Sequence, residues 1–422
     1  MKTNTDILII GGGSIGVCSA HYLSEAGKDV VLVDKSDICA GSSYGNQGLI
    51  VPSHSIPLAA PGVISKAFRW MFDPESPFYI KPRMDLELAR WLLEFQAACT
   101  RARMQPSLQV LRDLNLASVA LFTEIAAVDG LDFGFERKGS LMVYGTEKGL
   151  EGGIEEARIL SEKEIQTEIL DPDGLRKLDP TANYHASGAV YYPQDAHVIP
   201  AKFVRELARH VAGDPGRVRI HPSTEVIGFQ GRNGRIRTVV TTRGEFSANE
   251  VVLAGGAWSP VIAAELGIKL PIQPAKGYSV TFERPDRSPA IPASLSEAKV
   301  AVTPMGDMLR FGGTLELAGL DLSINKRRVA AILTAVPRYL PDLKPNRLKH
   351  IETWRGLRPC TPDGLPFLGR SPTYENLTVA AGHAMIGISL GPVTGKLISQ
   401  VVTRQTPSID IEPLRVDRFE KP

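Results

Sequence analysis

The sequence contains little cysteine and little net charge. Four cysteines stand among 422 residues, at positions 18, 39, 99 and 360, and no two of them form a C-x-x-C pair. This spacing excludes a disulfide framework and the usual zinc patterns, and it is typical of reduced, mostly buried thiols. The formal net charge of +2 gives no electrostatic reason to expect nucleic acid as a partner. We therefore expect neither a metal site nor a nucleic-acid partner.

Long apolar runs, internal repeats and low-complexity segments are also missing. No apolar stretch reaches the length of a membrane span. The first apolar strand begins so soon after Met1 that residues 1–6 cannot hold the charged and apolar parts of a signal peptide. The apolar content of 43% and the charged content of 22% are ordinary for a globular protein, and 422 residues suffice for two domains. These features predict a cytoplasmic globular protein.

The stretch from Thr5 to Ser36 has the pattern of a nucleotide-binding unit. Residues 7–10 form an apolar, β-branched run that predicts a buried parallel strand. A G-x-G-x-x-G motif follows directly, and its glycines are Gly11, Gly13 and Gly16. Helical spacing then extends over residues 15–26, and a second buried strand at 30–33 ends in Asp34.

Each part of this unit has a physical role in binding a dinucleotide. The first glycine permits a tight turn, the second lets the backbone approach a pyrophosphate, and the third lets the helix pack against the strand. The helix N-terminus offers free N–H groups and the positive end of a dipole. Asp34 stands near the position expected of a carboxylate that binds a ribose, and it would repel a 2′-phosphate. A glycine-rich structural turn is the alternative, but strand, helix and acid together favour a dinucleotide other than NADP.

Three later segments carry further glycine-rich patterns. The polar loop after Asp34 leaves the carboxyl end of the second strand, which is the ligand side of such a sheet. Residues 250–256 predict a buried strand whose final Ala-Gly-Gly can approach the cofactor closely. Residues 377–380 predict another strand, followed by a glycine-rich turn at 382–391 and a helix from about Pro392.

The rest of the chain predicts several helices and an antiparallel sheet. Helices are expected at 63–71, 86–99, 109–128 and 161–169, and an alternating antiparallel sheet at about 277–315. The helix at 63–71 mixes basic and aromatic residues, so it either lies on a membrane surface or packs against its own protein. His197 in the loop 193–200 is either an inert, hydrogen-bonded histidine or a site residue.

These blocks, in this order, resemble the flavin-dependent D-amino acid oxidase and glycine oxidase superfamily over nearly the whole chain. Within it the chain is most similar to the D-amino acid dehydrogenases. The motifs that carry the resemblance are SSYGNQG at 42–48, the insert that begins with APG at 60–62, KGYSVTF at 276–282, LRFGGTLEL at 309–317 and GLRPCTPDGLPFLG at 356–369. The resemblance implies FAD, held without a covalent bond, because the covalent relatives use a cysteine several positions before Cys360.

The resemblance also implies an α/β fold with two discontinuous domains. A Rossmann-like FAD-binding domain would comprise residues 1–52, 196–272 and 355–422. An α+β substrate domain on a mostly antiparallel sheet would comprise residues 53–195 and 273–354, with a helical insert at about 60–110. The FAD-binding residues that it implies are Gly11, Gly13, Ser14, Ile15, Gly16, Asp34, Lys35, Ser42, Ser43, Asn46, Gln47, Gly48, Leu49, Val226, Ala254, Gly255, Trp258, His383, Met385, Ile386, Gly387, Ile388 and Ser389.

The same resemblance assigns Arg358 to the carboxylate of an amino acid substrate. Further substrate candidates are Met385, Tyr278, Arg310 and His54. Met385 stands where glycine oxidases carry a second arginine, which argues for a substrate larger or less polar than glycine. The alternative for Arg358 is an ion pair with a nearby acid such as Asp363 that merely joins two segments, in which case Arg310 is the next candidate for the carboxylate.

The implied reaction is oxidative deamination of D-amino acids to 2-oxo acids and ammonia, by hydride transfer to the flavin. The implied acceptor is a quinone or a dye, while contact with the inner face of the cell membrane and oligomer formation stay open. A secondary-amine dehydrogenase or oxidase acting on D-proline, hydroxyproline, glycine or sarcosine is an alternative. A NAD-dependent dehydrogenase and a flavin-binding subunit that serves assembly are two others.

Overall fold

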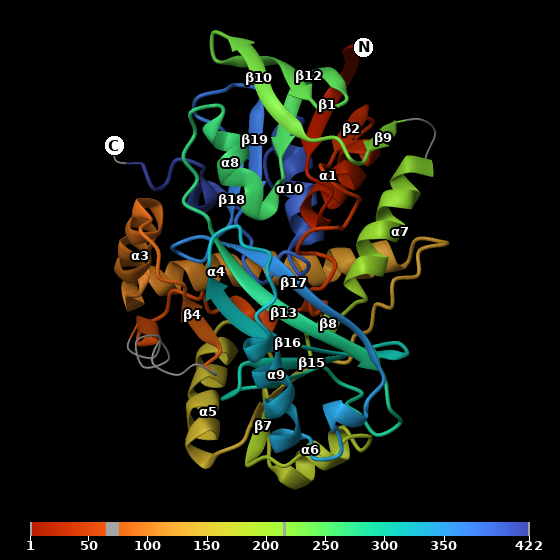
Figure 1. Ribbon diagram of the computed structural model, residues 1–422, viewed down its shortest axis with the longest axis vertical. Helices are drawn as coiled ribbons and strands as arrows, with labels where there is room; N and C mark the ends of the chain where they lie inside the picture. Colours follow the sequence, from red (N-terminus) through yellow and green to blue (C-terminus); the bar gives the residue numbers. More distant parts are fainter. Residues whose placement is uncertain (1, 65–75, 214–216, 421–422) are drawn as a thin grey trace.

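Two large β-sheets form the framework of the protein. The computed structural model describes residues 2–64, 76–213 and 217–420, so the helix predicted at 63–71 lies almost wholly outside the described residues. In Figure 1 the first sheet occupies the upper half of the molecule and the second sheet the lower half, and a long helix crosses between them.

The first sheet is mainly parallel at its centre and carries the predicted nucleotide-binding unit. Its strands are, in order, β10 (Val226–Arg232), β11 (Arg235–Thr241), β12 (Gly244–Leu253), β1 (Lys2–Ile10), β2 (Val30–Val33) and β9 (Val218–His221), and β19 (Leu377–Ala381) pairs with β12 and with β18 (Phe367–Arg370). Ile7 and Ile9 belong to one apolar core and Leu8 and Ile10 to another. Successive side chains of a strand point to opposite faces, so both faces of this sheet are covered.

The register of the parallel strands brings three chain segments to one edge. Ile10 pairs with Val33 of β2 and with Leu253 of β12. The residues that follow these strand ends therefore lie together at the carboxyl edge of the sheet, where ligands of such sheets bind.

The second sheet is mostly antiparallel, as predicted. Its strands are, in order, β17 (His350–Cys360), β13 (Gln273–Glu283), β16 (Met308–Leu317), β15 (Val300–Met305), β14 (Ala293–Leu295), β5 (Ser140–Tyr144), β7 (Gly188–Tyr192) and β6 (Glu168–Leu170), and β4 (Phe78–Ile80) pairs with β16. Tyr278, Val280 and Phe282 of β13 pack into one core on one face. On the other face Thr281 accepts a hydrogen bond from Arg310, which reaches the loop after β2. A further small sheet pairs β3 (Leu49–Ile50) with β8 (Ala196–His197).

Helices cover the faces of both sheets. They are α1 (Ser14–Glu25), α3 (Leu86–Ala98), α4 (Arg101–Ala126), α5 (Glu147–Ser161), α6 (Pro172–Leu178), α7 (Pro200–Gly213), α8 (Ser259–Ala264), α9 (Lys326–Tyr339) and α10 (Gly391–Val402). Short 3₁₀ turns are η1 (Pro52–Ser55), η2 (Gly256–Trp258), η3 (Pro345–Arg347) and η4 (Glu412–Leu414). Among the described residues, no helix combines the length and the apolar character that a bilayer span requires.

Two helices differ from the sequence prediction. The helix predicted at 161–169 is wrong, because α5 ends at Ser161 and the chain then leads into β6. Thr146 caps α5 by accepting the Gly149 N–H, whereas three glycines within the helix weaken its sequence signal. The helix α4 begins at Arg101, well before the predicted start at 109, because Thr100 provides an N-cap and the early Pro106 is tolerated.

The chain passes repeatedly between the two sheets. On this basis we propose the division into two discontinuous domains, one around each sheet. The boundary expected at residue 355 falls inside β17, which remains in the second sheet as far as Cys360. The end of β17 is therefore the better place for that boundary, since a strand paired along its length belongs to one sheet.

A buried carboxylate joins η1 to the second sheet. Asp195 is fully buried, and it accepts hydrogen bonds from the Ser53 N–H at 3.1 Å, from the Ser53 hydroxyl and from the Ser140 hydroxyl at 2.6 Å. Burial raises the pKa of Asp195 to about 6, because the charged form loses its hydration, and the three donors offset only part of this effect.

The raised pKa of Asp195 predicts a pH-dependent stability. Between pH of about 4 and 6 the folded state holds this proton while the unfolded state releases it, so the free energy of unfolding falls as pH rises through that window. One pKa unit corresponds to about 1.4 kcal/mol. Asp195→Asn should remove this component, so that the difference between variant and wild type changes with pH in denaturant unfolding. Parallel stability curves for the two proteins would contradict the assignment.

Candidate active site

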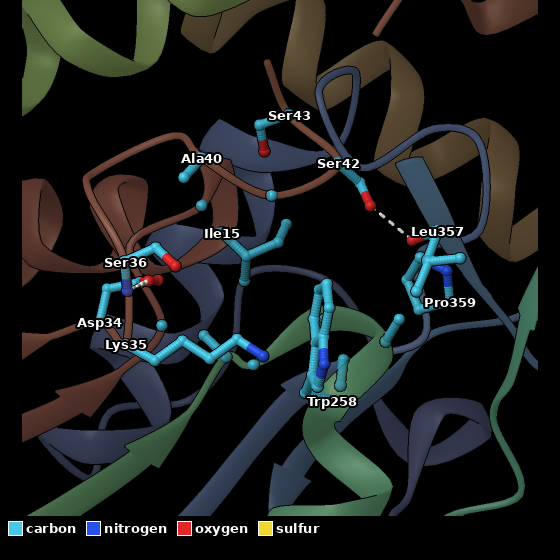
Figure 2. Close-up of a pocket in the computed structure, with 18 of the residues that line it drawn as sticks. Ile15, Asp34, Lys35, Ser36, Ala40, Ser42, Ser43, Trp258, Leu357 and Pro359 are labelled. Carbon is cyan, nitrogen blue, oxygen red and sulfur yellow. Dashed lines mark hydrogen bonds between the residues drawn. The ribbon is translucent and has the colours of Figure 1, made fainter. Parts of the chain in front are cut away.

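A cavity of about 610 Å³ lies where the carboxyl edge of the first sheet meets the second sheet. It is lined by the ends of β1, β2 and β12, by the loop after β2, by β17 and by the turn before α10. Its size is in the range of small-molecule and cofactor sites. Figure 2 shows residues from these separate segments around the same space.

The glycine motif forms the floor of this cavity. Gly11 has a φ of +117°, and a Cβ on it would overlap the Ala254 carbonyl oxygen. A Cβ on Gly16 would overlap the Gly11 carbonyl, so helix α1 can approach β1 only because neither position has a side chain. The N-cap of α1 is Gly13, which makes no side-chain cap bond. The first turn of α1 is therefore suited to hold an anionic group.

Asp34 and Lys35 form the end of the cavity beside β2. The Asp34 carboxylate accepts the Gly12 N–H at 2.7 Å and the Ser36 N–H at 2.8 Å, and burial raises its pKa. Each oxygen keeps a lone pair for a further donor. The Lys35 ammonium lies 3.9 Å from the centre of the Trp258 ring. Figure 2 shows the two side chains beside each other. The carboxylate can accept hydroxyl groups of a sugar, and the indole offers a flat apolar surface beside it.

Hydrogen bonds hold the loop of residues 42–48 between the two sheets. The Ser42 hydroxyl donates to the Leu357 carbonyl of β17. The Ser14 N–H donates to the Ser43 hydroxyl at 3.0 Å. The guanidinium of Arg310 donates to the Asn46 carbonyl at 2.7 Å and to the Tyr44 carbonyl at 3.2 Å. Arg310 is thus used to fix this loop, which makes it a poor candidate for binding a substrate.

The turn before α10 closes the opposite side of the cavity. His383 is buried, its Nε2 lies 3.0 Å from the Thr394 hydroxyl, and burial lowers its pKa to about 3. It is therefore neutral at physiological pH. The Ala384 N–H donates to the Pro359 carbonyl at 3.0 Å, which fixes the turn against β17. Met385 is 42% exposed at the tip of this turn.

Arg358 lies on β17 with its guanidinium over the backbone of β13. A Cβ on Gly277 would overlap this guanidinium, and its Nη1 donates to the Thr314 carbonyl at 2.6 Å. No carboxylate of a described residue pairs with it. Asp363 instead binds Arg418 at 2.8 and 3.0 Å, so the alternative of an Arg358–Asp363 pair is wrong. Burial lowers the pKa of Arg358, as expected for a cation without an acidic partner.

Most of the predicted cofactor residues line the cavity. They are Gly11, Gly13, Ser14, Ile15, Asp34, Lys35, Ser42, Ser43, Asn46, Val226, Ala254, Gly255, Trp258, His383, Gly387 and Ile388. The other predicted cofactor residues do not line it, although they belong to the segments that form it: Gly16, Gln47, Gly48, Leu49, Met385, Ile386 and Ser389. Residues 354–357 and 359 also line it and were not predicted, although they surround Arg358 in the sequence.

Five other residues that the sequence singled out do not line the cavity themselves. Two of them are Arg310 and Arg358, and Arg358 lies between the lining residues Leu357 and Pro359; the other three are Tyr278, His54 and His197. Tyr278 is buried, and its hydroxyl donates to Glu316 at 2.8 Å. His54 lies in η1, where burial lowers its pKa to about 4. His197 is buried in β8 with a Nδ1 that has no partner among the described residues, and burial lowers its pKa to about 4. These histidines are uncharged near neutral pH.

Comparison with known proteins shows the family to which this chain belongs. Residues 6–401 match the model of the DAO family, described as FAD dependent oxidoreductase. A curated D-amino acid dehydrogenase from Cereibacter sphaeroides is 32% identical over 422 residues, which cover 99% of this chain and 96% of the relative. Another, from Granulibacter bethesdensis, is 32% identical over 427 residues, covering 98% of this chain and 99% of the relative.

Solved structures share the same fold. Glycine oxidase from Geobacillus kaustophilus superimposes with a TM-score of 0.80 at 24% identity, covering 99% of both chains. L-proline dehydrogenase from P. horikoshii superimposes with a TM-score of 0.77 at 20% identity, covering 100% of this chain and 99% of the other. The cofactor is FAD, so the NAD-dependent alternative is wrong. The glycine floor and the N-terminus of α1 fit its pyrophosphate, and the Asp34 carboxylate fits its ribose.

Asp34→Ala should weaken FAD binding, because the variant loses a charged acceptor for the ribose hydroxyls. The expected loss is about 1.5–3 kcal/mol, which is typical of a hydrogen bond to a charged group. The dissociation constant can be measured by titrating the apoprotein with FAD and following flavin fluorescence. Because Asp34 also binds the Gly12 N–H, Asp34→Asn serves as the control that keeps the side-chain shape. Unchanged affinity in both variants would overturn the ribose assignment.

Proposed function

This chain belongs to the DAO family of FAD-dependent oxidoreductases, and from that premise we propose that it is a D-amino acid dehydrogenase. The proposed reaction converts a D-amino acid, water and an oxidised acceptor into a 2-oxo acid, ammonia and the two-electron-reduced acceptor. The full-length likeness to curated D-amino acid dehydrogenases supports this choice.

The observation that carries the proposal is the guanidinium of Arg358. It is a cation near the cavity with no acidic partner among the described residues, and one carbonyl oxygen, that of Thr314, occupies one of its donors. Arginine presents a planar fork of donors that matches a carboxylate in two parallel hydrogen bonds. A bound amino acid carboxylate would supply the missing negative charge.

Orientation is the main task of this chain in the proposed mechanism. When bound, FAD supplies the two-electron acceptor that takes a hydride from the substrate Cα. Arg358 would hold the carboxylate and so fix Cα, where proximity and orientation lower the barrier. The one titratable side chain of the turn before α10 that lines the cavity is His383, which is neutral and hydrogen-bonded to Thr394. A substrate amine that enters unprotonated needs no base, and the imine product is hydrolysed by water.

The acceptor that we propose is a quinone, reached at a membrane surface. Met84, Leu86 and Leu93 lie on α3 or just before it, and they are 106%, 90% and 68% exposed. Exposed apolar side chains on a helix favour contact with a bilayer, where lipid-soluble quinones reside. We propose that this face brings the protein to the inner side of the cell membrane.

Substitution of Arg358 tests the carboxylate role. Arg358→Lys keeps the charge but loses the fork, so KM for amino acids should rise by about tenfold or more, and Arg358→Ala should lose more. Gly277→Ala should act in the same direction, because its Cβ would displace the guanidinium. FAD content should be unchanged in all three proteins. Steady-state kinetics with a panel of D- and L-amino acids and proline would make the measurement.

Two results would contradict this assignment. Wild-type kcat/KM for amino acids in Arg358→Ala would place the carboxylate site elsewhere. Equal losses with an amine that has no carboxylate would mean that Arg358 supports the fold and not the substrate.

Acceptor preference tests the second part of the proposal. A soluble quinone or an artificial dye should reoxidise the enzyme much faster than oxygen does, because the proposed reaction delivers electrons to a membrane-borne acceptor. The measurement compares dye or quinone reduction with peroxide release in air, under the same substrate concentration. Peroxide release as fast as dye reduction would identify an oxidase.

A further inference from the structure

The indole of Trp354 occupies a place that two glycines keep clear. It lines the cavity, and it lies against Gly45 of the loop after β2 and against Gly356 of its own strand. A Cβ on either glycine would overlap the indole ring. The Tyr44 ring lies beyond it, with the ring centres 6.4 Å apart. The tryptophan is therefore seated between a loop that contacts the cofactor and a strand of the second sheet.

This indole is the neighbour of the Arg358 guanidinium. Trp354, Gly356 and Arg358 alternate along β17, so they share one face of the sheet. Gly356 pairs directly with Gly277 of β13. A Cβ on Gly277 would overlap the Arg358 guanidinium. Directly paired residues lie about 5 Å apart. The two glycines thus form a flat floor, with the indole over one and the guanidinium over the other.

A third residue on this face has an unused polar group. Ser279 pairs with Trp354 across β13 and β17, and its side chain points to the same face as Gly277. It is 2% exposed, and its hydroxyl has no hydrogen-bond partner among the described residues. Buried hydroxyl groups are normally paired, so this one is free to bond a polar group of a ligand that binds on this face.

We propose that Trp354 forms the wall against which the substrate side chain packs, and that it selects amino acids with an apolar side chain. This inference rests on the proposed function, because it takes Arg358 as the anchor of the carboxylate. A carboxylate on Arg358 places the rest of the amino acid within a few ångströms of the indole. Ala384, whose N–H donates to the Pro359 carbonyl, also lines the cavity and is apolar. An aliphatic or aromatic side chain therefore finds dispersion contacts here, whereas a charged side chain would lose hydration without a partner.

Ligand binding to the FAD-loaded enzyme tests this without turnover. Benzoate and acetate share the carboxylate but differ in apolar bulk, and their binding can be followed by perturbation of the flavin absorption spectrum. Trp354→Ala should weaken the binding of benzoate by about tenfold to a hundredfold, which is the range expected when apolar contact in a pocket is lost. Acetate affinity should change by about twofold or less. In kinetics, the ratio of kcat/KM for D-leucine to that for D-alanine should fall in parallel.

Gly45→Ala tests the same wall while keeping the indole. Gly45 does not have the positive φ that would forbid alanine, so its new Cβ should displace the ring with little backbone strain. As in Trp354→Ala, the affinity for benzoate should fall more than the affinity for acetate. Trp258→Phe is the matched control, because it alters an indole at the Asp34 end of the same cavity. It should change FAD affinity and leave the benzoate-to-acetate ratio as in wild type.

Two outcomes would overturn the inference while leaving the proposed function intact. One is an equal loss of benzoate and acetate in Trp354→Ala, which would make the residue a general support of the site. The other is a loss of FAD affinity with an unchanged ligand ratio, which would place the indole against the cofactor. Failure of every amino acid to reduce the flavin in the wild-type enzyme would instead overturn the proposed function.

Discussion

The contact between the edge of β17 and the cofactor-side loops is the constraint on which the site depends. β17 is an edge strand, so its outward backbone groups are free to bond elsewhere. The Ser42 hydroxyl donates a hydrogen bond to the Leu357 carbonyl, and the Ala384 N–H donates one to the Pro359 carbonyl. These two bonds flank Arg358 in the sequence. They set the distance between the dinucleotide cradle of the first sheet and Arg358, the proposed carboxylate anchor, on the second.

Glycine makes this close approach possible at several points. Gly11 and Gly16 let strand β1, helix α1 and the Ala254 carbonyl converge, and Gly277 gives the guanidinium its place on the sheet. A methyl group at any of these positions would overlap backbone or a charged group, so the site could not close without moving its parts. These glycines lie at two ends of the site. A substrate can be held beside the cofactor only if both ends stay free of additional side-chain atoms.

The sequence could predict the parts of the site that obey local rules. A buried strand, a glycine turn and an acid at the next strand end have fixed spacing, so Asp34 and the α1 N-terminus were found directly. The helix α5 was missed because its glycines hide the helical pattern, although Thr146 caps it. Arg310 was predicted as a candidate for binding the substrate, but its guanidinium donates to the Tyr44 and Asn46 carbonyls. Contacts between residues 264 or more positions apart leave no local pattern to read.

The charge balance around Arg358 supports the proposal that an acidic ligand binds at this position. Asp363, the nearest acid in the sequence, is taken by Arg418. Glu316 and Asp321 on the neighbouring elements are taken by the buried Lys276, which lies 3.6 and 3.1 Å from them. A buried cation without a counter-ion lowers the stability of the fold, and at Arg358 burial lowers the pKa of the guanidinium. A carboxylate that enters the site relieves it, so binding is favoured for an acid and disfavoured for a plain amine. The pairing of the neighbouring acids therefore supports the proposal that Arg358 binds the carboxylate of an amino acid.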